Sequence, residues 1–340
     1  MLQKPDLTDE TIVSCLRDEY ALSVAAITFL ALGADADTAV YRVIADDRTA
    51  YFLKLRRRGA FAASTVQVPQ ILHDQGIASV ITPIATTTGR LWTSLENFSV
   101  VLYPFTEGRD AFEVPLSDRQ WIEFGAALKG VHTAKLSPAS RAHIPSEGYS
   151  PRWRHRVREL QEWAARAGAT DPIAAPLAEF LRSKDETISD LVARAERLGS
   201  ALREQRPACV LCHADLHAFN LLISDSRLYI VDWDTTVFAP KERDLMFIGG
   251  GVGGVWNTDR EVELFYTGYG ATEVNPTALA YYRYERIVED IAACSDELLL
   301  DTAGEAARAE ALAMLRSQFA SNGVVDIAFR SDSRRTAPLW

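Results

Sequence analysis

The order of strand-like and helix-like segments constrains this fold more than any other feature of the sequence. Six runs rich in apolar, β-branched and aromatic residues come within the first 103 positions. These runs are 25–32, 40–44, 49–55, 79–84, 90–95 and 98–103. From Asp118 onward the apolar residues recur mostly at helical spacing. Strands gathered before helices predict an α+β fold, and the short links between the first three runs predict an antiparallel meander.

Length and composition predict two lobes. With 340 residues, 48% of them hydrophobic, the chain can bury a sizeable core. We predict an N-terminal lobe at 1–102, a hinge at 103–107 and a larger, mainly helical C-terminal lobe at 108–340. A helix after Thr8 should open the first lobe, because Thr8 is a suitable cap. In the C-terminal lobe, the pattern of residues 151–205 predicts two long helices.

One polar motif interrupts the helical part of the sequence. The run H-A-D-L-H-A-F-N ends at Asn220, and Asp232 follows an apolar strand twelve positions later. Transfer of a phosphoryl group from ATP requires a residue that orients the acceptor hydroxyl and further residues that hold Mg²⁺. We predict that Asp215 is the catalytic residue, and that Asn220 and Asp232 bind Mg²⁺ and with it the nucleotide. His213 and Asp244 are expected to brace this loop. The alternative is a polar turn with no catalytic function.

The N-terminal lobe is expected to bind the nucleotide. Lys54 lies inside the third strand, where kinases place the lysine that contacts the ATP phosphates. Backbone amides near Gly33 and the Thr38 hydroxyl are candidates for the phosphate-covering turn. The remaining candidates are the adenine contacts Leu102, Tyr103 and Phe105.

Lys54 lacks its usual partner. Kinases pair this lysine with a glutamate on the following helix, but the sequence has no acidic residue between Lys54 and Asp74. Gln67 could supply a neutral hydrogen bond, or an acid could come from elsewhere in the chain. The sequence leaves both possibilities open.

Charge and targeting signals narrow the class of partner. A formal net charge of −10 argues against nucleic acid and favours a small cationic substrate. The first twenty residues carry charges throughout, and no apolar run reaches the length of a membrane span. We therefore expect a cytoplasmic protein with neither a membrane nor an obligate protein partner.

Two other motifs match known signatures in letters only. Cys209 to His213 spells the haem attachment pattern, but the segment is expected to be a buried strand. Gly249, Gly251 and Gly254 spell a dinucleotide-binding pattern, but a helix rather than a strand should precede them. We expect neither haem nor a dinucleotide.

The acceptor is predicted to be small. A protein kinase has an arginine before its catalytic aspartate and a long activation segment after its metal aspartate. Here Ala214 takes the first position, and Pro240 follows Asp232 closely. Such a short segment is unsuited to holding a peptide substrate.

These motifs resemble those of the aminoglycoside phosphotransferase family. The runs H-A-D-L-H-A-F-N, I-V-D-W-D and A-P-K-E-R-D-L look like that family's motifs, and the glycine-rich run after them is similar to the spectinomycin phosphotransferases. The resemblance implies a bilobal protein-kinase-like fold, ATP and Mg²⁺ as cofactors, and phosphorylation of spectinomycin at its position-nine hydroxyl, which gives antibiotic resistance. It also implies the roles predicted above for Asp215, Asn220, Asp232 and Lys54. Near Ala63 this chain has alanine where the family has the helix glutamate.

A cationic, ring-shaped acceptor requires carboxylates and an aromatic surface. Besides Asp215, the candidates are Asp234, Trp256, Glu285 and Glu289. Alternatively, Glu285 and Glu289 pair with Arg286 or Arg283 on a solvated helix face. For the function, the alternatives are a kinase of another small alcohol and a catalytically silent nucleotide-binding homologue.

Overall fold

The computed structural model describes residues 4–31, 37–167, 174–251, 254–299 and 305–333. The chain forms two units, each of which has its own core. Unit 1 comprises Met1–Pro145 and Phe219–Val237, and unit 2 comprises Ser146–Ala218 and Phe238–Trp340.

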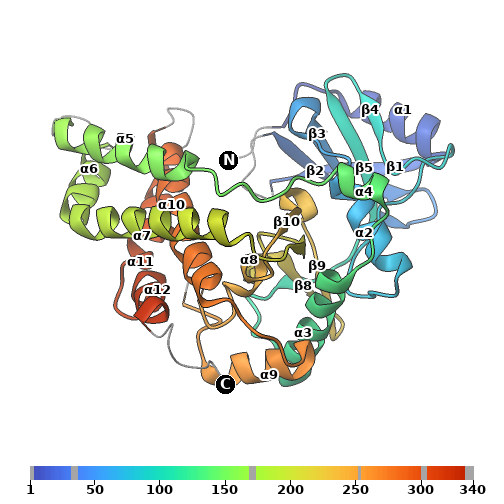
Figure 1. Ribbon diagram of the computed structural model, residues 1–340. Coiled ribbons are helices and arrows are strands. Elements are labelled where there is room, and N and C mark those ends of the chain that lie inside the picture. Colours follow the sequence, from blue (N-terminus) through green and yellow to red (C-terminus); the bar gives the residue numbers. More distant parts are fainter. Residues whose placement is uncertain (1–3, 32–36, 168–173, 252–253, 300–304, 334–340) are drawn as a thin grey trace. The chain divides into compact units, whose positions relative to one another are not determined.

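Unit 1 is built on a five-stranded antiparallel sheet with the order β1-β2-β3-β5-β4 (Figure 1). The strands are β1 (Val24–Leu30), β2 (Thr38–Ala45), β3 (Ala50–Arg57), β4 (Thr93–Leu95) and β5 (Phe98–Pro104). The first three form the predicted meander, which is confirmed.

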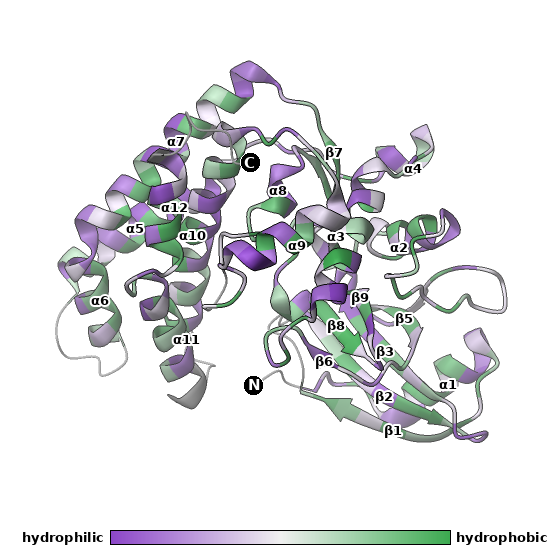
Figure 2. Ribbon diagram, turned by 90° about the horizontal axis from the view of Figure 1, so that it is seen from below, coloured by the Kyte–Doolittle hydropathy of each residue, from purple (hydrophilic) through white to green (hydrophobic). Residues whose placement is uncertain are grey.

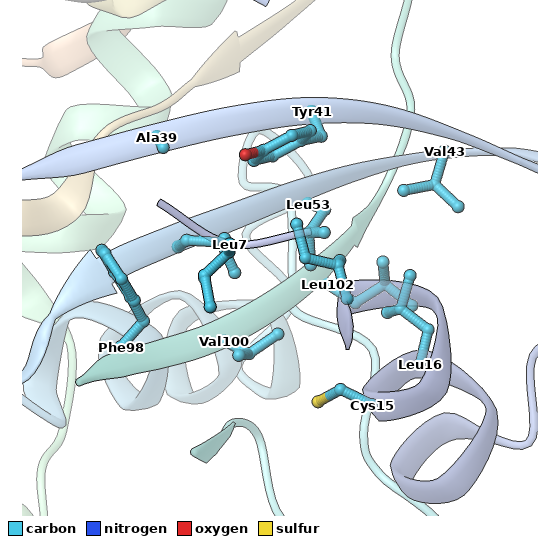
Figure 3. Packing of buried hydrophobic residues seen from close by; sticks show 12 residues of the cluster. Leu7, Cys15, Leu16, Ala39, Tyr41, Val43, Leu53, Phe98, Val100 and Leu102 are labelled. Atoms are coloured by element: carbon cyan, nitrogen blue, oxygen red, sulfur yellow. The ribbon is translucent and has the colours of Figure 1, made fainter. Parts of the chain in front are cut away.

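Helix α1 (Asp9–Tyr20) supplies part of the core on one face of this sheet. It begins as predicted, because the Thr8 side chain accepts a hydrogen bond from the Thr11 backbone nitrogen at 3.2 Å. Figure 3 shows Leu16 of α1 beside sheet residues of the same apolar cluster, among them Leu53 of β3. Because side chains alternate along a strand, Lys54 points away from this cluster.

The rest of unit 1 combines helices with a second, small antiparallel sheet. The helices are α2 (Ser64–Asp74), α3 (Asp118–Thr133) and α4 (Pro138–Ala142), with short 3₁₀ turns at η1 (Arg58–Ala60) and η3 (Trp233–Thr235). The small sheet contains β6 (Arg109–Asp110), β8 (Leu221–Ser224) and β9 (Arg227–Ile230). Since β6 pairs with β8 and α3 packs on β9, residues 108–145 group with the large sheet's unit. This division differs from the predicted lobe boundary at 103–107.

Unit 2 is mainly helical, and α10 contacts most of its other helices. Its helices are α5 (Arg152–Arg166), α6 (Ala174–Ser183), α7 (Asp185–Gln205), α8 (Glu242–Leu245), α9 (Asp259–Tyr269), α10 (Pro276–Leu299), α11 (Glu305–Gln318) and α12 (Val324–Ser333). The short strands β7 (Val210–Cys212) and β10 (Val237–Ala239) pair with each other. In Figure 2, hydrophilic and hydrophobic residues recur along α5 and α7, as amphipathic helices require.

The prediction of two helices over 151–205 is wrong, because three helices occupy this range. Pro176 lies in the first turn of α6, where a missing backbone N–H is tolerated. Lys184 then separates α6 from α7. Among the helices that the structure describes, none combines the length and the hydropathy needed to cross a membrane.

Candidate active site

A buried carboxylate shapes the loop that carries Asp215. Asp244 of α8 is fully buried and accepts hydrogen bonds from the backbone nitrogens of His213, at 3.0 Å, and Ala214, at 2.7 Å. Ala214 has a φ of 73°, which is unfavourable for a residue with a β-carbon. The two hydrogen bonds to Asp244 offset that strain, and Asp244 thus braces the loop as expected.

Replacing Asp244 by alanine is expected to lower the free energy of unfolding by about 2–4 kcal/mol, because two buried N–H groups lose a charged acceptor. Urea denaturation measures this loss. Glu204→Ala is the control, since Glu204 is exposed near the end of α7 and should change stability by no more than about 0.5 kcal/mol. Equal effects of the two substitutions would contradict the bracing role.

The carboxylate of Asp215 is contacted from two sides within unit 2. Arg286 of α10 donates a hydrogen bond to one oxygen, and Nε2 of His217 lies 3.3 Å from the other. Burial alone would raise the pKa of Asp215, but the hydrogen bond with His217 and the charge of Arg286 outweigh it and hold the pKa well below its usual range. Asp215 is therefore a charged hydrogen-bond acceptor at neutral pH.

In unit 1, Lys54 lies between two carboxylates. Its Nζ is 2.7 Å from Asp234 and 3.1 Å from Asp232. Arg56, two positions along the same strand, also pairs with Asp234. Burial disfavours the charge of Lys54, but the two carboxylates outweigh burial and raise its pKa. The lysine is thus held charged, with its direction fixed by Asp234.

This arrangement supplies the missing partner of Lys54. The acid comes from the turn η3 after Asp232, and not from α2. The acid is Asp234, which was predicted to bind the acceptor and instead pairs with the lysine. Its carboxylate is occupied by two cations of its own unit, so we do not carry Asp234 into the proposed acceptor site.

Asn220 and Asp232 lie on neighbouring segments of unit 1. The backbone nitrogen of Val231 donates to the carbonyl oxygen of Asn220 at 3.0 Å, so the residue before Asp232 is paired with Asn220. The Asp232 side chain is 51% exposed, and its backbone adopts a left-handed conformation with φ of 62°. An amide and an exposed carboxylate on paired segments provide the oxygen ligands that Mg²⁺ prefers, and these residues fit the predicted metal site.

The other predicted nucleotide contacts differ in how accessible they are. Thr38 begins β2 opposite Arg56, and Gly33 lies outside the described residues. Leu102 has its side chain in the core and its carbonyl oxygen bound to the Ile84 nitrogen at 2.7 Å. This leaves Tyr103 and Phe105 as the proposed base contacts.

Two of the predicted acceptor contacts are buried. Glu285 is only 6% exposed and forms an ion pair with the buried Arg154. Trp256 is 2% exposed. Glu285 therefore has its carboxylate paired with a buried cation, and the Trp256 ring has little exposed area. The acceptor roles of Glu285 and Trp256 stay predictions, and we do not include them in the proposed site.

Glu289 remains a candidate because it is half-buried. It pairs with Arg243 at 3.9 Å. The alternative of a solvated helix face differs from the structure, because Glu285 is buried and the arginine partners are Arg154 and Arg243.

The glycine pattern at 249–254 and the haem-like pattern at 209–213 both have structural explanations. Gly249 and Gly251 have positive φ, and a β-carbon on Gly250 would lie 1.9 Å from the Met246 carbonyl oxygen. The glycines thus serve a tight turn that follows the short helix α8. Cys212 is fully buried in β7, as a small apolar side chain would be.

Comparison with known proteins decides the family. A model of the phosphotransferase enzyme family (APH) matches residues 28–282, which is most of the chain. The chain belongs to this family. The resemblance seen in the motifs, the kinase-like α+β fold and the prediction of a phosphotransferase are confirmed.

Individual relatives of this phosphotransferase include enzymes with solved structures. Spectinomycin phosphotransferase APH(9)-Ia, solved with ADP and spectinomycin, is 34% identical, with a TM-score of 0.88 covering 96% of this chain and 99% of that one. Amicoumacin kinase hAmiN, at 17% identity and a TM-score of 0.62, covers 94% of both chains and shares the fold. Protein StrN of Streptomyces griseus is 28% identical over 185 residues, which cover 52% of this chain and 57% of StrN.

Two features, one in each unit, were not predicted from the sequence. Arg286 was considered only as a partner for glutamates, although it contacts Asp215. Phe219, inside the polar motif, is 44% exposed and stacks on Phe112 with ring centroids 4.4 Å apart. A large aromatic residue in a polar loop was the available signal for the second feature, whereas nothing in the sequence pointed to the first.

Proposed function

We propose that this phosphotransferase is an ATP- and Mg²⁺-dependent enzyme that phosphorylates a hydroxyl of an aminocyclitol antibiotic and so confers resistance. Spectinomycin, at its position-nine hydroxyl, is the proposed acceptor. The observation that carries the proposal is the 34% identity to spectinomycin phosphotransferase over nearly the whole chain, which includes the braced Asp215 loop. ATP is a cytoplasmic metabolite, so we expect the protein to act there.

In the proposed reaction, Asp215 accepts the hydrogen bond of the acceptor hydroxyl and orients its oxygen. That oxygen forms a bond to the γ-phosphorus, the bridging bond to the β-phosphate breaks, and its electron pair stays on ADP. The hydroxyl proton passes to Asp215 and then to solvent. Lys54, directed by Asp234, contacts the phosphates, while Asn220 and Asp232 hold Mg²⁺. The metal ion, when bound, neutralises phosphate charge.

The acceptor is expected to be a cationic ring compound. Spectinomycin carries two amines that are protonated near neutral pH. Asp215 and Glu289, both in unit 2, are the proposed carboxylates for such groups. The net charge of −10 supports the same class of ligand.

A panel assay tests the proposal directly. The protein is incubated with Mg-ATP and spectinomycin, with other aminocyclitols and aminoglycosides, and with sugars and amino alcohols, and ADP release is followed. We expect ADP release with spectinomycin well above the rate without acceptor, and a phosphorylated product by mass spectrometry. Turnover on another acceptor but not on spectinomycin would overturn the substrate, and no turnover on any compound would favour the silent homologue.

A kinase of another small alcohol is the second candidate. Glu285 pairs with Arg154, and Asp234 pairs with Lys54. These pairings favour the second candidate, because they leave fewer carboxylates for the ammonium groups of an acceptor than the sequence predicted. The sugars and amino alcohols in the panel test it.

A further inference from the structure

Arg286 links the catalytic loop to the longest helix of unit 2. One guanidinium nitrogen donates to Asp215, while Nε donates to Asp290 at 2.8 Å. Gln318 of α11 donates to the second oxygen of Asp290 at 3.1 Å. Asp290 therefore holds the Nε of the Arg286 guanidinium, while another nitrogen of the same group contacts Asp215. The position of Arg286 thus does not depend on Asp215 alone.

Other groups enclose the same contact. The ring of Phe247 lies 5.5 Å from the Arg286 guanidinium and 5.8 Å from the His217 ring. Other titratable groups near this contact, among the residues that the structure describes, are His217 in the loop, Asp290 and Glu289 on α10, and Asp244, which accepts from the loop backbone. The side chain of Asp215 is 27% exposed and that of Arg286 is 24% exposed, so the pair is only partly open to water.

We propose that Arg286 is the positioning residue of Asp215, fixing the orientation in which the carboxylate receives the acceptor hydroxyl. This inference rests on the proposed function, in which Asp215 is the acceptor of that hydrogen bond. A carboxylate offers about four lone-pair positions. Arg286 contacts one oxygen of Asp215 and His217 lies beside the other, so both oxygens are held in a defined orientation.

The contact also sets the kind of catalysis that Asp215 performs. A carboxylate held charged beside an arginine is a weak base, suited to orienting a hydroxyl and receiving its proton late. Such a role agrees with a loose transition state for phosphoryl transfer, in which the attacking oxygen needs little activation. Arg286 thus fixes the orientation of the Asp215 carboxylate and at the same time makes that carboxylate a weaker base.

Two substitutions of Arg286 test the proposal. In Arg286→Gln, which removes the charge, kcat should fall about 10- to 100-fold with the KM for ATP nearly unchanged. Without the cation the pKa of Asp215 rises, so the acid limb of the kcat/KM profile should move to higher pH by about 1–3 pH units. Arg286→Lys keeps the charge but cannot reach both carboxylates with a fixed fork, so it should restore much of the pH profile and only part of kcat.

The matched control is Arg156→Gln. Arg156 of α5 pairs with Asp296 of α10, ten residues beyond Arg286 on the same helix, at 2.9 Å. Its removal breaks a comparable contact to α10 without touching the loop, so kcat and the pH profile should stay at wild-type values. An unchanged or increased kcat in Arg286→Gln would overturn the proposal, because Arg286 would then be dispensable or would merely block the carboxylate.

Failure of the proposed function is distinguished by a second measurement. Thermal unfolding of Asp215→Asn, Arg286→Gln and the double variant reports the coupling of the two side chains without any substrate. Non-additive shifts in Tm are expected. If the wild type phosphorylates no acceptor, the proposed function fails while this coupling still stands, and additive shifts would overturn the contact itself.

Discussion

Replacing Asp215 by asparagine is expected to lower kcat by about 10²- to 10⁴-fold, the usual contribution of a positioned proton acceptor. The amide has nearly the same shape, so the loop held by Asp244 should keep its conformation. However, it carries no charge and cannot receive the hydroxyl proton. Lys54, Asn220 and Asp232 are unaltered, so the Kd for ATP should change little. Steady-state kinetics with the best acceptor and a nucleotide-binding titration measure the two quantities.

The control for this substitution is Asp225→Asn. Asp225 is exposed in the turn between β8 and β9 and has a φ of 45°, a conformation that asparagine adopts readily. The Asp225→Asn variant carries the same chemical change away from the Asp215 loop, and its kcat should equal that of the wild type. A kcat for Asp215→Asn within tenfold of the wild-type value would remove Asp215 from the catalytic role.

Replacing Asp234 by asparagine is expected to give the second-largest effect. The substitution takes the negative charge from between Lys54 and Arg56, so Lys54 loses the partner that fixes its direction. We expect kcat/KM for ATP to fall about 10- to 100-fold, since misplaced phosphate contacts weaken transition-state stabilisation. The free energy of unfolding should fall by about 1–3 kcal/mol, because two partly buried cations lose a charged acceptor. Kinetics with varied ATP and urea denaturation measure these changes.

Asp9→Asn is the matched control for Asp234→Asn. Asp9 of α1 pairs with Lys4 at 2.8 Å, but both side chains are exposed, and neither is a predicted nucleotide contact. An exposed pair of this kind contributes about 0–1 kcal/mol, and neither ATP kinetics nor stability should change appreciably. If the two variants behave alike, Asp234 has no special role as the partner of Lys54.

The predictable part of the fold comes from local patterns. The three strands around Lys54 were predicted because alternating apolar residues and turn residues specify a meander within a short stretch of chain. The helix count between 151 and 205 was wrong because Pro176 occurs in a first turn, where proline does not break a helix. A break at Lys184 has no comparable local signal.

The sequence by itself determined the family and the fold class, and it predicted the chemistry of Asp215, Asn220 and Asp232, because these depend on residue types at characteristic spacing along the chain. Only the tertiary structure decided the partners of the charged side chains. Lys54 and Asp234 are 180 positions apart, and Arg286 and Asp215 are 71 apart. Similarly, the burial of Glu285 depends on Arg154 from another helix. Ion pairs form between whichever opposite charges the packing of helices and strands brings together, and no local pattern records that choice.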